Sequence, residues 1–421
     1  MWEDRGLCFG VCFTIEPGEV STSHSSTIYF RQLLFFYREG VCMLDLTAIS
    51  VVDNHCHPIL LEQHMSGPQF RQRWTEAKDG SLAEKHLHNS VYYLWTIRQL
   101  AQFYGCENTE DAVLAARDSQ SGDELLARLV KAANIDALVL DLGYPPPEIS
   151  YTAEYTAQAA GCRTVSILRV EILMQQLILQ YENFDEVIER LAQHIKRARE
   201  DGYRGLKSIA AYRTGLNIAE WSKDEAAAVF AKLRPQAVSE GSLRLAHKPL
   251  NDYLLHVVFQ AAAEQQLPIQ FHTGYGDSDT DMRLGNPLQL RDVLERSDYQ
   301  SMPVVLLHES YPYSQLGAYL AAIYPHVYFD LSYTIPFIDK LEMLAFTRQA
   351  LSIAPASKLV YSTDGIYMPE MYWLGAVRGR SVLAQVLQEM IEADELDEQQ
   401  AYHLARLVLH DTAAELYALL P

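Results

Sequence analysis

The sequence predicts an α/β protein, a (β/α)8 TIM barrel with a helical insertion after the first strand. Short apolar segments with the length of buried strands alternate with amphipathic stretches, which is typical of a parallel sheet built from βα units. Eight such segments occur, and eight is the number of strands that closes this barrel. The predicted strands lie near residues 50–56, 135–141, 163–169, 204–209, 268–272, 303–307, 326–331 and 358–363.

Helices are expected between these strands, because apolar residues recur there at i, i+3 and i+4. The connection over about 59–133 is too long for a simple loop, and its aromatic residues have helix-like spacing. We expect it to fold as a small helical cap whose aromatics serve packing more than substrate contact. The last stretch, 394–420, is expected to form a C-terminal helical segment. The clearest amphipathic stretches are 184–199, 223–232, 251–265 and 341–353.

Residues 1–42 differ in pattern from the rest of the chain. Their apolar run at 7–15 is too short to span a bilayer, and the charges before it are in the wrong order for a signal peptide. The barrel pattern begins directly after Met43, and single barrels of this class reach a length of 421 residues. We therefore expect 43–421 to form one barrel domain and 1–42 to be a poorly ordered extension. The alternative for the extension is an interfacial segment.

The composition excludes several classes of function. Hydrophobic residues make up 49% of the chain and charged residues 21%, so the chain can bury a large core. The formal net charge of −20 repels nucleic acid and anionic membranes, and we expect neither as a partner. The six cysteines include no Cys-x-x-Cys pair, which favours a reduced, cytoplasmic location. The expected partner is a small-molecule substrate, and association into a homo-oligomer is left open.

The strongest functional signal is the pair His55 and His57 at the end of the first predicted strand. Residues i and i+2 of a strand point to the same side, so both imidazoles would project together as half of a zinc site. Asp53 shares this face one layer deeper, where we expect it to orient the histidines. Cys56 alternates with the histidines and is expected to pack in the core.

Four later apolar runs each end in a residue that binds metals or ionises, namely Lys207, His272, His308 and Asp364. A single histidine at a strand end is usually just a satisfied polar group. Five strand ends carrying His-x-His, Lys, His, His and Asp in this order are much harder to obtain by chance. The C-terminal ends of barrel strands meet at one mouth, so these distant residues are expected to lie together.

This set of strand ends, together with Asp53, resembles the amidohydrolase superfamily of metal-dependent barrels. Within it the chain is similar to the amidohydrolase-related group, also called amidohydrolase 2, which supplies the N-terminal half of nodulin/glutamine-synthetase fusion proteins. Segments 206–213 and 308–313 carry this narrower match. The resemblance covers roughly residues 44–421.

The resemblance implies a divalent metal and a hydrolytic reaction. Mixed nitrogen and oxygen ligands suit zinc, with iron or manganese as alternatives, and one or two ions are expected. Asp364 would also accept the proton of the attacking water. The ligands of the first ion would be His55, His57, His272 and Asp364.

Two residues decide between one ion and two. Lys207 is either a carbamate that bridges two ions or a charged group that binds a substrate carboxylate. The segments beside it are apolar, which favours a neutral amine. His308 is correspondingly either a ligand of the second ion or a catalytic hydrogen-bond donor to the substrate carbonyl.

Substrate contacts are expected from the loops at the mouth. Arg213, just beyond the fourth strand, can hold a carboxylate through a bidentate pair, and Tyr311 is a second substrate-binding candidate. Segment 277–281 begins like a calcium loop, but Met282 stands where that loop needs glycine. We expect this segment to belong to a mobile loop near the substrate.

The predicted function is metal-dependent hydrolysis of a C–N bond, in an amide or amidine of a small polar metabolite. A decarboxylase or an isomerase on the same barrel is an alternative, since this architecture does not fix the reaction. A non-catalytic regulatory domain is a further alternative. The intact set of strand-end residues counts against it, because an idle site would be free to lose ligands.

Overall fold

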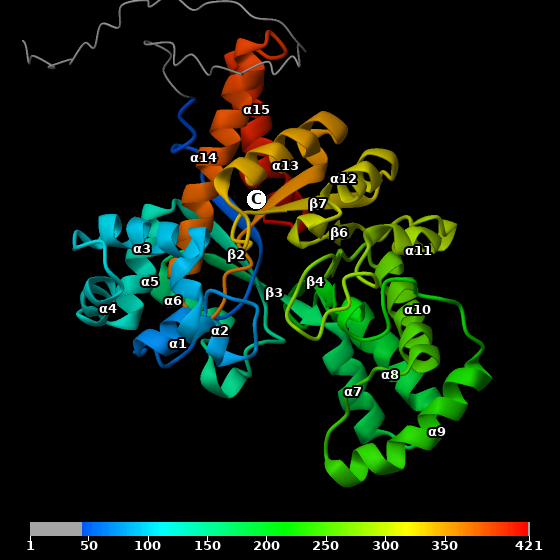
Figure 1. The fold of residues 1–421 in the computed structure, drawn as a ribbon. Coiled ribbons are helices and arrows are strands. Elements are labelled where there is room, and N and C mark those ends of the chain that lie inside the picture. Colours follow the sequence, from blue (N-terminus) through cyan, green and yellow to red (C-terminus); the bar gives the residue numbers. More distant parts are fainter. Residues whose placement is uncertain (1–43, 420–421) are drawn as a thin grey trace, which may run out of the picture. The chain divides into compact units, whose positions relative to one another are not determined.

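The computed structural model describes residues 44–419 and confirms the (β/α)8 barrel (Figure 1). The eight strands are parallel and follow one another around the sheet in chain order. Backbone hydrogen bonds from Asp364 N to His55 O (2.9 Å) and from His57 N to Gly365 O (2.8 Å) join the ends of the first and last strands. The predicted extension, 1–42, lies outside the described residues. The strands are β1 Val51–Cys56, β2 Ile135–Asp141, β3 Arg163–Arg169, β4 Tyr203–Ser208, β5 Ile269–Phe271, β6 Val304–Leu306, β7 Val327–Ser332 and β8 Leu359–Ser362.

The helical insertion predicted between the first two strands is also present. It holds five helices, which lie together at the lower left of Figure 1. They are α1 Gly67–Gln72, α2 Gly80–Lys85, α3 Val91–Tyr104, α4 Glu110–Asp118 and α5 Gly122–Ala132. The aromatic residues of the insertion mostly pack, as expected: Trp74, Tyr92 and Tyr93 are each at most 3% exposed.

Helices also follow the later strands, and the C-terminal helical segment is confirmed. The predicted helix at 223–232 continues as α9 to Glu240, through Pro235. Phe230 and Ala237, on either side of this proline, are buried, so packing offsets the cost of a proline inside a helix. The remaining helices are α6 Ala153–Ala160, α7 Val170–Gln180, α8 Phe184–Arg197, α9 Lys223–Glu240, α10 Lys248–Glu264, α11 Arg291–Leu294, α12 Ser314–Ile323, α13 Lys340–Ile353, α14 Glu370–Glu392, α15 Glu398–Arg406 and α16 Thr412–Leu416.

Two apolar layers hold the barrel together, one between strands and helices and one inside the ring of strands. The inner layer contains strand side chains, among them Val52 and Ala137 near the starts of their strands, and side chains of the C-terminal segment. Tyr417 of that segment enters this layer and donates a hydrogen bond to Asn54 Oδ1 (2.8 Å). The N-terminal end of the barrel is therefore filled, and space for a ligand remains at the other end.

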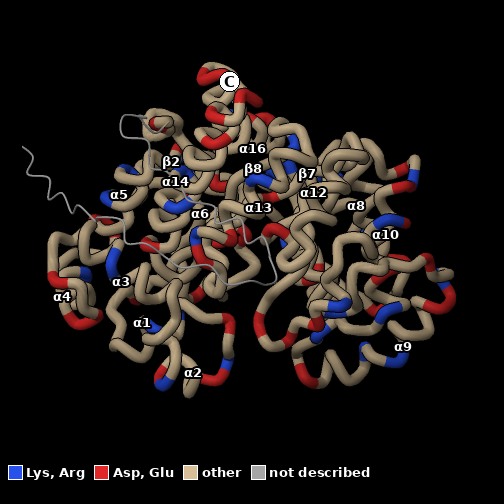
Figure 2. The backbone as a smooth tube through the Cα atoms, turned by 45° about the horizontal axis from the view of Figure 1, so that its top comes forward, with Lys and Arg blue, Asp and Glu red and all other residues tan. Residues whose placement is uncertain are grey.

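Charged residues of both signs are interspersed along the helices and loops (Figure 2). Among residues 44–419, no helix combines the length and the apolar character needed to cross a membrane.

Candidate metal centre and its pocket

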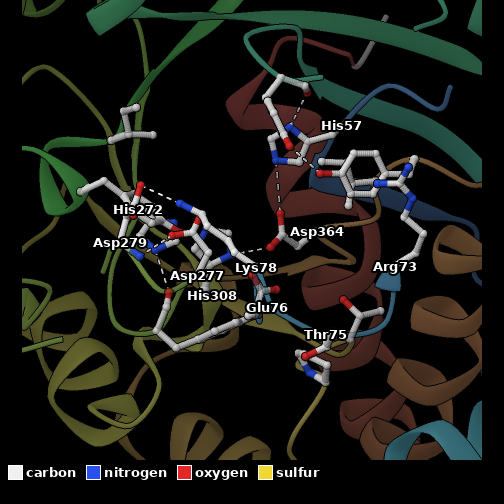
Figure 3. A pocket seen from close by; sticks show the side chains of 18 of the residues that line it. His57, Arg73, Thr75, Glu76, Lys78, His272, Asp277, Asp279, His308 and Asp364 are labelled. Atoms are coloured by element: carbon white, nitrogen blue, oxygen red, sulfur yellow. Dashed lines mark hydrogen bonds and ion pairs between the residues drawn. The ribbon is translucent and has the colours of Figure 1, made fainter. Parts of the chain in front are cut away.

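A cavity of about 420 Å³ opens at the C-terminal ends of the strands (Figure 3). Five of the six predicted strand-end residues line it, namely His57, Lys207, His272, His308 and Asp364, whereas His55 is not part of the lining. This volume is in the range of sites for small molecules. The mouth predicted for a barrel enzyme is thus where the polar strand ends meet.

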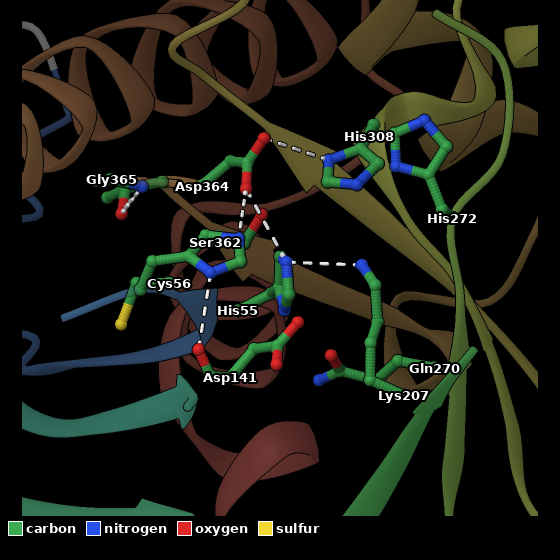
Figure 4. Close-up of polar contacts among 12 residues, drawn as sticks. His55, Cys56, Asp141, Lys207, Gln270, His272, His308, Ser362, Asp364 and Gly365 are labelled. Atoms are coloured by element: carbon green, nitrogen blue, oxygen red, sulfur yellow. Dashed lines mark hydrogen bonds and ion pairs between the residues drawn. The ribbon is translucent and has the colours of Figure 1, made fainter. Parts of the chain in front are cut away.

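The carboxylate of Asp364 lies among three imidazoles (Figure 4). Its Oδ1 is 3.4 Å from His55 Nε2 and 3.4 Å from His57 Nε2, and its Oδ2 is 3.2 Å from His308 Nδ1. Two groups of three residues each offer donor atoms that all lie within 4.8 Å of one another. One group is His55, His308 and Asp364, and the other is His55, His57 and Asp141. The cluster therefore offers nitrogen and oxygen ligands at close range.

Backbone geometry turns two of these side chains into the cavity. Asp364 has a φ of 51° and His308 a φ of 59°, both in the left-handed region. A non-glycine residue there costs on the order of 1–3 kcal/mol and is usually held by its surroundings. Asp364 N donates to His55 O, and His308 N donates to Asp330 Oδ2 (3.0 Å), which fixes both turns.

Buried ring nitrogens without partners show that these residues fit a divalent metal. His57 Nδ1 donates to the carbonyl oxygens of Tyr144 (3.0 Å) and Asp141 (3.3 Å), which leaves Nε2 free to bind a cation. His308 Nδ1, which lies 3.2 Å from Asp364 Oδ2, is buried and has no hydrogen-bond partner in the described part of the chain. Buried polar atoms without partners are costly, and a bound cation would compensate this cost.

Electrostatics favour the protonation states that bind metals at His55, His308 and Asp364. Burial lowers the pKa of His55 well below its ordinary value, and the charge of Lys207 lowers it further. Burial also lowers the pKa of His308, more than the nearby carboxylate of Asp364 raises it. Burial raises the pKa of Asp364, but His308 and His57 outweigh it and hold this pKa well below the usual range. Neutral imidazoles and an ionised carboxylate are the forms that act as ligands.

Lys207 lies at the edge of this cluster. Its Nζ is 3.2 Å from His55 Nε2, and the side chain is 2% exposed. Burial lowers its pKa to about 8. Its backbone pairs with Arg169 of β3 on one side and with Gln270 of β5 on the other.

His272 lies beside the cluster, next to His308. The two ring centroids are 4.4 Å apart, and His272 Nε2 donates to Tyr275 O (2.7 Å). The two donor sets described above do not include His272. It remains a predicted ligand, and only its Nδ1 is free for that role.

Asp53 supports the cluster from behind. Its Oδ1 accepts hydrogen bonds from Thr363 N (2.9 Å) and His55 N (3.4 Å), so it links β1 to the residue before Asp364. Burial raises its pKa to about 8. This arrangement agrees with the orienting role expected for it.

The residues predicted to bind substrate lie in different surroundings. Arg213 lines the cavity, and so do Asp277 and Asp279 of the loop after β5. Tyr311 instead packs its ring on Phe337 (5.5 Å between centroids) and lies outside the cavity lining. In the same loop, Asp281 and Arg283 pair with each other at 2.6 Å.

Sequence reasoning missed two acids, Asp141 of the donor cluster and Glu76 of the cavity lining. Asp141 ends β2 and is held by Arg169, whose Nε is 3.1 Å from its Oδ2. Although burial raises the pKa of Asp141, the charge of Arg169 outweighs it and the pKa is lowered. Glu76 comes from the insertion and lines the cavity, and burial together with Asp364 raises its pKa to about 7. A local signal existed for Asp141, because its strand ends in a carboxylate. None existed for Glu76.

The barrel and its donor clusters define a class of protein, the metal-dependent (β/α)8 enzymes. A family model described as amidohydrolase matches residues 185–419, which is more than half of the chain. The chain therefore belongs to the amidohydrolase family, as its strand-end residues suggested. This membership supports metal-dependent catalysis and leaves the bond that is cleaved undefined.

Three relatives illustrate the match. Protein fluG of Emericella nidulans is 28% identical over 406 residues, which cover 88% of this chain and 46% of fluG, so the chain spans about half of that relative. A Lactobacillus casei structure provisionally described as a metal-dependent hydrolase has a TM-score of 0.79 and 29% identity, over 90% of this chain and 98% of that one. A uronate isomerase of Thermotoga maritima has a TM-score of 0.62 at 15% identity, over 88% and 95% of the chains, and shows the fold alone.

Proposed function

We propose that this protein is a metal-dependent hydrolase that cleaves a C–N bond, in an amide or amidine, of a small polar metabolite. The observation that carries the proposal is the carboxylate of Asp364 set among His55, His57 and His308 at the cavity. The Lactobacillus casei relative, provisionally described as a metal-dependent hydrolase, agrees with it. The three described cysteines are free thiols, which is consistent with a cytoplasmic location.

The histidines and Asp364 would hold the metal, and their nitrogen and oxygen donors suit zinc. A divalent ion there would supply electrophilic polarisation of the substrate carbonyl and a water acidic enough to react near neutral pH. Asp364 is ionised, and its side chain is 24% exposed toward the cavity, so it can accept the proton of that water.

The leaving nitrogen needs a proton, and Glu76 is placed to give it. Its side chain faces the cavity (Figure 3), near enough to Asp364 for that charge to raise its pKa. With a pKa of about 7, Glu76 holds a proton for part of the time at neutral pH. Two acids with different pKa values in one pocket can divide the roles of base and acid between them. If His308 does not bind the metal, it can instead donate a hydrogen bond to the substrate carbonyl.

Metal analysis followed by a substrate panel tests the proposal. We expect protein purified without chelator to contain one or two divalent ions per chain. It should release amine or ammonia from at least one compound among N-acyl amino acids and γ-glutamyl amides. Carbon dioxide release from aromatic acids, or sugar isomerisation without C–N cleavage, would contradict hydrolysis. A chain that binds no metal at all would point to a regulatory domain.

A further inference from the structure

Two arginines converge on one wall of the cavity. Arg213 follows the 3-10 turn Ala210–Tyr212 after β4, and Arg244 lies between α9 and α10. Arg213 Nη1 and Arg244 Nη2 both donate to the carbonyl oxygen of Tyr212, each at 3.4 Å. Two like charges thus meet on one neutral acceptor, and both side chains line the cavity.

Only one of these two guanidinium groups forms an ion pair. Arg244 Nη1 is 3.5 Å from Asp279 Oδ2. Within residues 44–419, no carboxylate lies within ion-pair distance of Arg213, and its buried Nε has no hydrogen-bond partner. Burial and the charge of Arg244 lower the pKa of Arg213 more than the charges of Glu171 and Asp279 raise it. A partly buried cation without an ion-pair partner is costly, and an anion between the two arginines would reduce this cost.

The other cations of the cavity have neighbours of their own, and the Nζ of Lys207 lies within the donor cluster, 3.2 Å from His55 Nε2. Arg169 pairs with Asp141, and Lys78 pairs with Asp279 at 2.7 Å. Arg73 lies over the ring of Tyr367, 4.1 Å from its centroid. Among the described cavity residues, Arg213 is therefore the group best placed to receive an anion from solution.

We propose that Arg213, assisted by Arg244, binds a carboxylate of the substrate. The planar fork of an arginine matches the two oxygens of a carboxylate. Asp277 and Asp279 line the same cavity and would repel a phosphate group, which carries two charges at one point, more than a carboxylate group, which carries one. The substrate class is then a small carboxylate-bearing amide, such as an N-acyl amino acid. The assignment of an amide group to this substrate rests on the proposed hydrolase function, whereas the carboxylate is inferred from the two arginines.

Calorimetric binding of ligands without a C–N bond tests the carboxylate site apart from turnover. The probes are glutarate, its neutral analogue pentane-1,5-diol, and inorganic phosphate, with full-length, metal-loaded protein. We expect glutarate to bind at least about tenfold more tightly than the diol, since hydrogen bonds between charged groups are the strong ones. Arg213→Met should remove most of that preference. Arg244→Met should remove less of it, because Asp279 already holds Arg244.

Two further variants serve as controls. Arg98→Met changes an exposed arginine of α3 and should bind glutarate like the wild type. Arg213→Lys keeps the charge but not the planar guanidinium group, so its preference for glutarate should lie between those of wild type and Arg213→Met. If Arg213→Met does not fold, Arg213→Lys tests the inference in its place. Wild-type protein that binds no glutarate, glutarate binding unchanged in Arg213→Met, or Arg213-dependent preference for phosphate would each overturn the inference.

Amide hydrolysis by the same variants separates the two proposals. Arg213-dependent glutarate binding without hydrolysis of any amide would leave the carboxylate site standing and remove the hydrolase. Hydrolysis of neutral amides that Arg213→Met does not affect would leave the hydrolase standing and remove the carboxylate site.

Discussion

The cavity has two walls that are built differently. One consists of strand ends, where Lys207 and His308 are each 2% exposed and backbone bonds fix the turns. The other is the segment 72–78 of the insertion, which is buried at Trp74 but 51% exposed at Lys78, whose side chain pairs with the loop acids Asp277 and Asp279. The strand-end wall can hold a metal in fixed geometry. The insertion wall, with its exposed ion pairs, suits contact with a substrate that enters and leaves.

The largest effect should come from the strand-end wall. Asp364→Asn keeps the volume of the side chain but loses its charge and its ability to accept a proton. We expect amide hydrolysis to fall at least about a hundredfold and metal content to fall with it. Amine release and elemental analysis measure these two quantities. The matched control, Asp224→Asn on exposed α9, should change neither.

Full activity of Asp364→Asn with normal metal content would remove this residue from the mechanism. Loss of both properties together is the behaviour expected of a wall that binds the metal.

A change in the insertion should separate activity from metal binding. Glu76→Gln removes an acid without touching the strand ends, so we expect at least about a tenfold loss of rate near pH 6 and unchanged metal content. The wild-type rate should fall as pH rises through about 7, where Glu76 loses its proton. Glu76→Gln should lack this limb of the pH profile. Metal loss in Glu76→Gln would show that the two walls do not act separately.

Glu76 also makes a prediction for stability that needs no substrate. Its pKa is raised from 4.5 to about 7 in the folded protein, so the folded state binds this proton more tightly than the unfolded state. Its contribution to stability is complete below pH 4.5 and is lost as pH rises to about 7. Thermal melting of wild type and Glu76→Gln at pH 5 and pH 8 should therefore show a smaller decrease for the variant.

Much of the strand-end wall could be predicted, because its signals are local. All eight strands follow from apolar runs, and the pair His55 and His57 from the alternation of side chains along a strand. Asp141 was overlooked although its strand also ends in an acid. The position of His272 beside His308 depends on how its ring is turned, through the bond to Tyr275 O, and no spacing encodes that.

The insertion wall could not be predicted from local pattern. Its helical content follows from aromatic spacing, but the place of Glu76 near Asp364 depends on contacts between residues about 290 apart in the chain. Such contacts are set by the packing of whole helices against the barrel. Tyr311 stays a predicted substrate contact, and its packing on Phe337 is likewise a contact that local pattern does not encode.

The number of ions that the strand-end wall holds is expected to depend on whether Lys207 is a carbamate or a free amine. If it is a carbamate bridging two ions, wild type should contain about two metals per chain, bicarbonate should aid reconstitution, and Lys207→Ala should contain fewer. Elemental analysis after dialysis measures this number. One metal per chain in both proteins, with weaker carboxylate binding in Lys207→Ala, would make the lysine a substrate anchor and the centre mononuclear.

The smallest effect is expected from the exposed ion pairs of the insertion wall. Lys78→Met removes the contacts with Asp277 and Asp279, and exposed pairs contribute about 0–1 kcal/mol. We expect a change of that size in the free energy of unfolding, weaker at high salt, and a modest rise in KM. Lys85→Met, an exposed lysine of the neighbouring α2, is the matched control. A large loss of stability in Lys78→Met would mean that this wall is as firmly built as the other.

X-ray absorption spectroscopy at the metal edge can establish whether the strand ends bind a metal, with full-length protein purified without chelator and with a His55→Ala, His57→Ala double variant. We expect a bound divalent ion in the wild type with histidine nitrogen and carboxylate oxygen neighbours, at about 2.0–2.2 Å for zinc. The double variant should lose most of this ion. A wild type without bound metal, or a double variant with the same occupancy and the same spectrum, would show that the strand ends are not a metal centre.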